Sequence, residues 1–406
     1  MPDGPVARMV VGVVGAGTMG AGIAQAALQA GHEVLLHDVD AAAIQRGRDR
    51  ISAALQRLVN KGRVTPEERA AYLATLRDAA DLDEVAADAD LIVEAALEDL
   101  PLKRSIFRQL DMNSLPDVPL ATNTSALSVA AVAEATHHRE RVLGLHFFNP
   151  APVMPLVEVV ATPDTARSVI EAAVAFASGL GKTPVVCGDS PGFIVNRINR
   201  GFTLEPLRML EAGAADVQAI DAAVEAAGYP MGPFRLLDLV GIDVNLAVAR
   251  SLFEAFDDSS RFRPSPVQLA MVEAGRLGRK SGGGFYRYDA EGTLLGPEPP
   301  AGLEGAGGRH GAGPGARLDD RSIVERVNLA IVNEAYRAVE ERVAAPGDID
   351  LAMKLGANHP LGPFERAGQM GLRSVVEGLR RLHAETAELS GDQYEIAPLL
   401  WQMATV

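Results

Sequence analysis

Short apolar runs alternate with amphipathic stretches along the first half of the chain. The first run, residues 9–14, is followed by a glycine-rich turn, a helix of small residues and a second run at 33–38. A strand, a helix and a strand in such a short span form the unit of a parallel β-sheet. We therefore predict a doubly wound α/β domain over residues 1–188. Its later strands are expected at residues 89–95, 119–122, 142–146, 156–160 and 183–187.

From residue 189 the apolar positions take a helical period, and two stretches resemble each other. The hexapeptide at residues 229–234, YPMGPF, recurs as HPLGPF at 359–364. Four upstream residues, Asn199, Glu205, Arg208 and Asp221, recur at one constant offset as Asn328, Glu334, Arg337 and Asp350. We therefore predict two homologous all-α domains, at residues 189–295 and 319–406. Residues 296–318 between them are mostly Gly, Pro and Ala, a composition that predicts a flexible linker.

The first turn has the composition of a dinucleotide-binding loop. It reads Gly-Ala-Gly-Thr-Met-Gly, follows the first predicted strand and opens the first helix, as in a Rossmann-like domain. Gly15 would allow a tight turn, Gly17 close approach to a pyrophosphate, and Gly20 close helix packing. Asp38 ends the second strand, where a carboxylate would bind the ribose hydroxyls of NAD and repel the 2′-phosphate of NADP. The alternative is a glycine-rich turn without a ligand.

Polar residues at the ends of two later strands suggest a catalytic site. Ser125 and His146 follow or end predicted strands, and strand ends line the ligand crevice of a parallel sheet. Histidine is a common general base. Glu158 lies in an apolar run, where a carboxylate needs a partner, and His146 would be that partner. A single histidine alone is more often a hydrogen-bonded structural residue.

Composition narrows the class of protein. The 406 residues carry a formal net charge of -15, which opposes binding to nucleic acid. One cysteine, Cys187, makes neither an internal disulfide nor a cysteine-based zinc site, and we expect no metal. Residues 9–31 are apolar and lie near the N-terminus, as the core of a signal peptide would, but several glycines lower the hydrophobicity of this segment. We find no apolar run long enough to span a membrane, and we expect a cytoplasmic protein.

The chain resembles the 3-hydroxyacyl-CoA dehydrogenase family. The matching segments, in order between residues 9 and 288, are residues 15–20, 123–125, 146–150, 152–154, 156–158, 191–197, 229–234 and 280–286. The resemblance implies NAD-dependent oxidation of a (3S)-3-hydroxyacyl-CoA, with 3-hydroxybutyryl-CoA as the expected short-chain substrate. It implies His146 as general base, Glu158 as its orienting carboxylate, and Ser125 and Asn196 as hydrogen-bonding groups for the substrate. With the glycine loop, the expected cofactor contacts are Gly15, Gly17, Met19, Gly20, Asp38, Glu98, Lys103, Ser125, Asn149 and Lys280.

A basic stripe could hold the anionic CoA. On a helix over residues 46–63, one face would carry Arg46, Arg50, Arg57 and Lys61, and the opposite face Ile44, Ile51, Leu55 and Leu58. The alternative is an ordinary solvated face. In the resembled family a lysine matching Lys61 contacts CoA, and so does a serine that is Ala54 here. That difference leaves the remaining CoA contacts open.

Two other functions and one assembly are considered. The chain could oxidise a small free hydroxy acid, as a gulonate-dehydrogenase-like enzyme would, or it could be a non-catalytic relative of the kind found among crystallins. Single-copy members of the resembled family pair two subunits through the helical domain. We therefore predict that residues 319–406 pack on residues 190–290 about a pseudo-twofold axis. The second copy should be catalytically silent, because Glu325 replaces Asn196. The alternative is an appended domain that builds a larger homo-oligomer.

Overall fold

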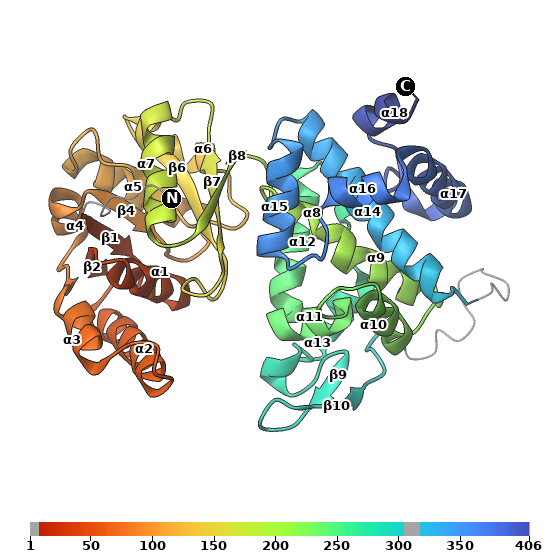
Figure 1. Ribbon diagram of the computed structural model, residues 1–406, viewed down its shortest axis with the longest axis horizontal. Coiled ribbons are helices and arrows are strands. Elements are labelled where there is room, and N and C mark those ends of the chain that lie inside the picture. The colour runs from red at the N-terminus through yellow and green to blue at the C-terminus, as the bar shows by residue number, and fades with distance from the viewer. Residues whose placement is uncertain (1–7, 304–316, 406) are drawn as a thin grey trace. The chain divides into compact units, whose positions relative to one another are not determined.

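The computed structural model describes residues 8–303 and 317–405, which form two compact units that divide at residue 193. In the described part of the first unit, the strands form one eight-stranded sheet in the order β3-β2-β1-β4-β5-β6-β7-β8 (Figure 1). Neighbouring strands are parallel except for the antiparallel pair β6 and β7. The strands are β1 (Val10–Val14), β2 (Glu33–His37), β3 (Leu76–Asp78), β4 (Leu91–Glu94), β5 (Leu120–Thr122), β6 (Val142–Phe147), β7 (Leu156–Ala161) and β8 (Thr183–Gly188).

Helices connect the successive strands of the first unit except β6 and β7, which confirms the predicted Rossmann-like α/β fold. Most central strands are buried along their whole length, so they appear in the sequence as continuous apolar runs. The α-helices are α1 (Thr18–Gln29), α2 (Ala41–Asn60), α3 (Pro66–Ala74), α4 (Leu82–Asp88), α5 (Leu100–Asn113), α6 (Val129–Ala133) and α7 (Arg167–Gly179), with a 3-10 turn η1 (Arg139–Arg141).

The second unit is largely helical and contains both predicted copies. The first copy comprises α8 (Val195–Ile198), α9 (Arg200–Glu211), α10 (Val217–Ala226), α11 (Pro233–Val240), α12 (Ile242–Ala255) and α13 (Pro266–Glu273), with 3-10 turns η2 (Ser260–Phe262) and η3 (Arg279–Ser281). The second comprises α14 (Asp320–Glu340), α15 (Pro346–Gly356), α16 (Pro363–Met370), α17 (Leu372–Ser390) and α18 (Pro398–Thr405).

A small hairpin corrects the expectation that the first copy is entirely α-helical. Strands β9 (Tyr286–Tyr288) and β10 (Leu294–Pro297) pair antiparallel. The linker predicted to begin at residue 296 therefore starts inside β10. Just beyond β10, Arg276 Nη1 donates to the Pro299 carbonyl oxygen at 2.7 Å. Residues 304–316 of the predicted linker lie outside the described residues.

The two recurring hexapeptides form the same helix-capping corner. Asp221 accepts a hydrogen bond from the Phe234 backbone nitrogen at the start of α11, and Asp350 accepts one from the backbone at the start of α16. A Cβ added at Gly232 would lie 2.3 Å from the Asp221 carboxyl carbon, and one at Gly362 would lie 2.2 Å from that of Asp350. The corner therefore requires glycine in both copies, because the capping aspartate occupies the space of a side chain.

The two copies exchange buried ion pairs. Arg197 of the first copy contacts Glu334 of the second, with 2.6 Å between Nε and Oε1. At the equivalent positions, Arg326 of the second copy contacts Glu205 of the first, with 2.8 Å between Nε and Oε1. Figure 1 shows α9 and α14, the helices carrying the two glutamates, side by side. Each pair is the other with the roles of the copies reversed, which is the relation that a pseudo-twofold axis produces.

Two hydrogen bonds show the same reciprocity. The Tyr229 hydroxyl donates to Asn328 Oδ1 at 2.9 Å, and His359 Nε2 lies 3.0 Å from Asn199 Oδ1. Tyr229 and His359 are the first residues of the two hexapeptides, and the two asparagines are equivalent. The helices cross closely, because a Cβ added at Gly201 would lie 2.7 Å from a backbone nitrogen of α14. The second copy therefore packs on the first through matched contacts.

Candidate active site

The glycine loop between β1 and α1 has the geometry of a phosphate-binding turn. Gly15 has a φ of +101°, which disfavours any other residue there. A Cβ at Gly20 would lie 1.7 Å from the Gly15 carbonyl oxygen, whereas one at Gly17 would have no neighbour within 4 Å. No side chain caps the start of α1, so its first N–H groups can bind an anion. Gly15 and Gly20 thus shape the loop, and Gly17 leaves space for a ligand.

Two side chains anchor this loop. Asp38 Oδ2 accepts a hydrogen bond from the Ala16 backbone nitrogen at 2.7 Å, and Oδ1 accepts one from Val39. On the other side, Arg50 Nη1 donates to the Ala16 carbonyl oxygen at 3.3 Å. The sequence predicted Asp38 as a ribose ligand and did not anticipate that it also holds the turn. Met19, expected beside the cofactor, is partly buried and packs against the hydrophobic core.

Lys103, an expected cofactor contact, is buried in the first unit beside Glu94. Its side chain has no exposed surface, and Nζ lies 2.8 and 3.0 Å from the two oxygens of Glu94. Thr122 also donates to Glu94, at 2.7 Å. The ammonium group is thus neutralised inside the domain, and it supports the ends of β4 and β5. Glu94 is not among the residues expected from the sequence, although an acid at the end of the apolar run of β4 indicates a buried partner.

Glu98 joins the loops that follow β4 and β5. Its Oε1 accepts from the Thr124 hydroxyl at 2.5 Å and from the Ser125 backbone nitrogen at 2.9 Å. Burial would raise the pKa of Glu98, but the Thr124 hydrogen bond, the Lys103 ammonium and the Ser125 backbone nitrogen together lower it. An ionised Glu98 therefore fixes the backbone that carries Ser125.

His146, Glu158 and Ser125 form one hydrogen-bonded chain. His146 Nδ1 lies 2.6 Å from Glu158 Oε2, and its Nε2 lies 3.2 Å from the Ser125 hydroxyl. The two residues are opposite each other in the antiparallel pair of β6 and β7. Glu158 has no exposed surface and the histidine is 4% exposed. The buried carboxylate fixes which imidazole nitrogen carries a proton, so the other nitrogen faces the serine ready to accept one.

The surroundings of this chain restrict the motion of the imidazole. The rings of Phe148 and Phe193 lie 4.5 and 5.6 Å from that of His146, measured between centroids. The Phe147 backbone nitrogen donates to Asn123 Oδ1 at 2.8 Å, which ties the end of β6 to the loop after β5. Burial and the nearby Glu158 carboxylate raise the pKa of the Cys187 thiol well above its usual range. The imidazole is thus almost fully buried and packs against two aromatic rings.

Two of the expected site residues belong to the second unit. Asn196 lies in the short helix α8 and is half-buried. Lys280 lies in η3, and its Nζ donates to Asp243 Oδ2 at 2.8 Å. Asn149, in the first unit, is exposed after the end of β6.

Three of the four residues of the predicted basic stripe lie on α2, which ends at Asn60, and Lys61 is its C-cap residue. The apolar face of this helix is buried at Ile44, Ile51 and Leu55. Its opposite face is exposed at Arg46, Arg50, Arg57 and Lys61. Ala54 is only partly exposed. The stripe is accessible to an anionic ligand, with Lys61 at the carboxyl end of the helix.

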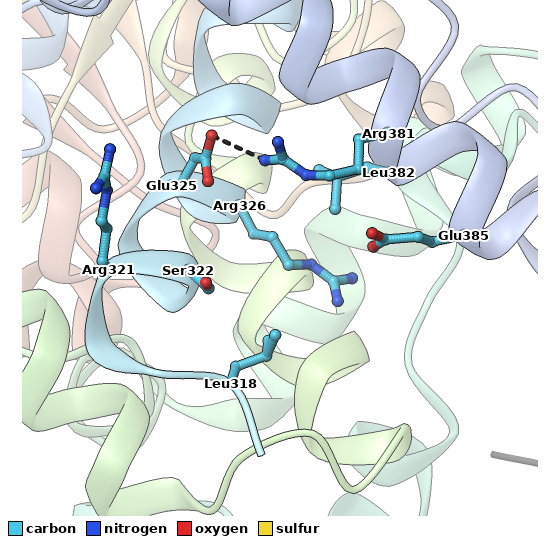
Figure 2. Close-up of a pocket in the computed structure, with 8 residues that line it drawn as sticks. All are labelled: Leu318, Arg321, Ser322, Glu325, Arg326, Arg381, Leu382 and Glu385. Carbon is cyan, nitrogen blue, oxygen red and sulfur yellow. Dashed lines mark ion pairs between the residues drawn. The ribbon is translucent and has the colours of Figure 1, made fainter. Parts of the chain in front are cut away.

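A pocket of about 410 Å³ lies in the second copy, and its lining contains none of the candidate catalytic residues. Figure 2 shows its charged lining and an ion pair between Glu325 and Arg381, which are 2.9 Å apart. Glu325 stands at the position equivalent to Asn196, so a carboxylate engaged by an arginine replaces a neutral amide. Among residues 8–303 and 317–405, no three His, Cys, Asp or Glu side chains are placed to hold a metal ion. No helix in the same ranges is long and apolar enough to cross a membrane.

Comparison with known proteins identifies the family. Residues 10–190 match the 3-hydroxyacyl-CoA dehydrogenase NAD binding domain, and residues 192–288 and 323–406 match the C-terminal domain of the same family. The 3-hydroxyadipyl-CoA dehydrogenase of Escherichia coli is 37% identical over 97% of each chain. A 3-hydroxybutyryl-CoA dehydrogenase of Mycobacterium tuberculosis is 47% identical over 68% of this chain and 98% of its own.

A solved structure shares the whole arrangement. The crystal structure of 3-hydroxybutyryl-CoA dehydrogenase from E. coli K12 superposes with a TM-score of 0.87 at 36% identity, covering 98% of both chains. Relatives of the single-copy kind stop before the second helical copy, whereas these full-length relatives include it. The chain thus belongs to the 3-hydroxyacyl-CoA dehydrogenase family and is an NAD-dependent oxidoreductase whose C-terminal domain occurs in two segments.

Proposed function

We propose that the protein oxidises (3S)-3-hydroxyacyl-CoA thioesters of short chain, such as 3-hydroxybutyryl-CoA, to 3-oxoacyl-CoA, with His146 as general base. The observation that carries this proposal is the chain from Ser125 through His146 to Glu158. A base oriented by a buried carboxylate and aimed at a hydroxyl is the arrangement that removal of an alcohol proton requires.

The residues divide the work by their chemistry. His146 takes the proton of the 3-hydroxyl group through Nε2, while Glu158 holds Nδ1–H and stabilises the imidazolium that forms. Ser125 donates to the substrate oxygen or to the histidine, and Asn196, by resemblance, hydrogen-bonds the substrate. Neither is charged, so they polarise oxygens without competing for the proton.

The residues of the first unit suit NAD. The open space at Gly17 and the uncapped start of α1 would accept the pyrophosphate, and Asp38 would accept the ribose hydroxyls. Bound NAD supplies the hydride acceptor. Lys103 would influence cofactor binding indirectly, because its ammonium group is paired with Glu94 and Glu98.

Replacing His146 with glutamine tests the proposal. We expect kcat for 3-hydroxybutyryl-CoA oxidation by NAD to fall at least about 10²-fold, from loss of general-base catalysis, while NAD binding persists. His383→Gln, an exposed histidine on α17, is the matched control and should be unchanged. Near-normal turnover in the first variant contradicts the role of His146. Activity on free 3-hydroxybutyrate but not on the thioester would instead support the small hydroxy-acid alternative.

A second substrate is favoured by the relative that spans both helical copies. That relative is named for 3-hydroxyadipyl-CoA, and its alignment covers 97% of this chain. Parallel assays with 3-hydroxybutyryl-CoA and with 3-hydroxyadipyl-CoA, whose six-carbon acyl group carries a second carboxylate, show which substrate the enzyme prefers.

We further propose that the second copy replaces a subunit contact within one chain and is catalytically silent. The reciprocal ion pairs and hydrogen bonds support internal pairing, and Glu325 in place of Asn196 supports silence. A chain ending at Leu303, beyond β10, would expose the buried Arg197 and the face of α9. We expect it to dimerise or to lose solubility, as measured by light scattering. A soluble monomer contradicts internal pairing.

A further inference from the structure

Arg200, the first residue of α9, is a buried cation without a carboxylate partner among the described residues. Its side chain sits in a residue that is 5% exposed. Nε donates to the Asn196 carbonyl oxygen at 3.0 Å, and Nη1 lies 3.5 Å from that of Asn245. Burial lowers its pKa to about 10. Buried guanidinium groups are normally paired with anions, as Arg197 is with Glu334 three residues earlier in the chain.

The neighbours of Arg200 are also polar and incompletely paired. Asn245 on α12 accepts a hydrogen bond at Oδ1 from Gln268 Nε2 on α13, at 3.0 Å. The other amide atom, Gln268 Oε1, is buried without a hydrogen-bond partner in the described part of the chain. Val244, adjacent to Asn245, is 47% exposed, so the helix is accessible immediately beside the cluster. We call these three residues, Arg200, Asn245 and Gln268, the polar cluster.

The second helical copy provides an internal control for this cluster. The equivalent positions are found by aligning three pairs of helices. We align α9 with α14 on their matched residues, and α12 with α17 and α13 with α18 on the first residue of each helix. They carry Leu329, Val375 and Leu400. All three have no exposed surface and belong to one apolar cluster. The same fold is therefore built with an apolar core at this place, and the polar cluster is not needed for packing.

An unpaired buried charge is costly, so its presence only in the copy that carries Asn196 points to a ligand. We propose that Arg200 binds a carboxylate at the far end of the acyl chain, so that the enzyme acts on ω-carboxylated 3-hydroxyacyl-CoA thioesters. This inference rests on the proposed function, in which Asn196 hydrogen-bonds the acyl-CoA substrate. Arg200 lies one helical turn further, about 6 Å along the axis. A six-carbon dicarboxylic acyl group places its second carboxylate a few carbons beyond the thioester.

The charge of Arg200 explains why the enzyme would prefer an acyl chain that ends in a carboxylate to one that ends in a methyl group. A carboxylate supplies the anion that the guanidinium lacks and can accept two parallel hydrogen bonds from it. A methyl group at the same place leaves the guanidinium desolvated and unpaired. Sites that hydrogen-bond a polar substrate group reject the analogue that lacks it much more strongly than apolar pockets reject a change in size.

The wild-type enzyme gives the first test. We expect kcat/KM with NADH to be at least about 10²-fold higher for 3-oxoadipyl-CoA than for 3-oxohexanoyl-CoA, which has the same chain length and no carboxylate. Arg200→Leu, the residue of the second copy, should lower kcat/KM for 3-oxoadipyl-CoA at least about 10²-fold and change it for 3-oxohexanoyl-CoA less than about threefold. Arg250→Leu, at an exposed arginine of α12, is the matched control and should leave both values unchanged.

Equal kcat/KM of the wild type for the two substrates overturns the proposal, and so does a parallel loss on both in Arg200→Leu, because that indicates a structural role. If Arg200→Leu does not fold, Arg200→Lys and the wild-type comparison decide. Calorimetry with unreactive adipyl-CoA and hexanoyl-CoA separates this inference from the proposed function. Tighter binding of adipyl-CoA supports Arg200 even if neither 3-oxoacyl-CoA is reduced, a result that would remove only the proposed function; equal binding overturns the role of Arg200.

Discussion

Substituting Glu158 with glutamine should keep the orientation of the His146 imidazole but remove the electrostatic stabilisation of its protonated form. Glutamine has nearly the same shape and still reaches Nδ1, which is 2.6 Å from the native carboxylate oxygen. The negative charge is lost. Between an imidazolium and a carboxylate about 4 Å apart, at an effective dielectric constant of about 20, the attraction is about 4 kcal/mol. If that attraction forms fully in the transition state, its loss costs about 10³-fold in rate.

Two effects modify this estimate in opposite directions. The amide oxygen of glutamine retains part of the electrostatic attraction, which reduces the loss. Its amide nitrogen can instead donate to Nδ1, which would place the imidazole proton on the wrong nitrogen and increase the loss. We therefore expect kcat for oxidation of the hydroxyacyl-CoA to fall between about 10² and 10⁴-fold, with little change in the KM for NAD.

The assay is steady-state reduction of NAD by 3-hydroxybutyryl-CoA and by 3-hydroxyadipyl-CoA, alongside thermal unfolding of each variant. Glu171→Gln is the control, because Glu171 is an exposed carboxylate on α7 whose pair with Arg167 contributes little. If Glu158→Gln folds and retains kcat within about tenfold of the wild type, the carboxylate is not electrostatically coupled to the base and the reasoning fails.

Three further outcomes follow from the structure. Asp38 should give NAD at least about a 10²-fold advantage in kcat/KM over NADP through charge repulsion, and Asp38→Asn should reduce it; comparable wild-type values would contradict this. Burial raises the pKa of Asp221 from 3.8 to about 7, so the stability contributed by its protonated form is full below about pH 4 and is lost as pH rises through 7. The free energy of unfolding of the wild type relative to Asp221→Asn should accordingly fall by up to about 4 kcal/mol between pH 4 and pH 8 in urea titrations, and a constant difference would refute the shift. Arg326→Met leaves Glu205 buried beside fewer cations and should cost about 3–5 kcal/mol of unfolding free energy, whereas Arg381→Met, at an exposed pair, should cost less than about 1 kcal/mol.

The fold was predictable where burial imposes a long pattern. Strands buried on both faces give continuous apolar runs, and the repeated hexapeptide revealed the duplication because proline and glycine constrain its corner. Strand β3 was missed because it has three residues and only Leu76 is buried. The β9–β10 hairpin was missed for a related reason, since β10 has no buried residue and its register is irregular.

The site was predictable where a motif fixes chemistry, and less so where partners come from distant strands. Ser125, His146 and Glu158 come together as expected. Ser125 follows β5, and the other two residues lie in β6 and β7, the next two strands of the sheet. The burial of Lys103 depends on the direction in which α5 presents it, which the sequence does not specify. Arg200 resembles an ordinary solvated residue at the start of a helix, and only its burial reveals it.

The duplication separates residues that build the fold from residues that serve chemistry. Both copies experience the same packing demands, so a residue retained in both, such as the corner aspartates Asp221 and Asp350, serves architecture. The fold does not require a polar residue that is present in one copy and replaced in the other by an apolar residue or by a residue of different charge. Asn196 and Arg200 meet this criterion, one replaced by Glu325 and the other by a buried leucine. Because the two positions lie one turn apart, the residues of the first copy that we propose to contact the substrate lie together at the junction of α8 and α9.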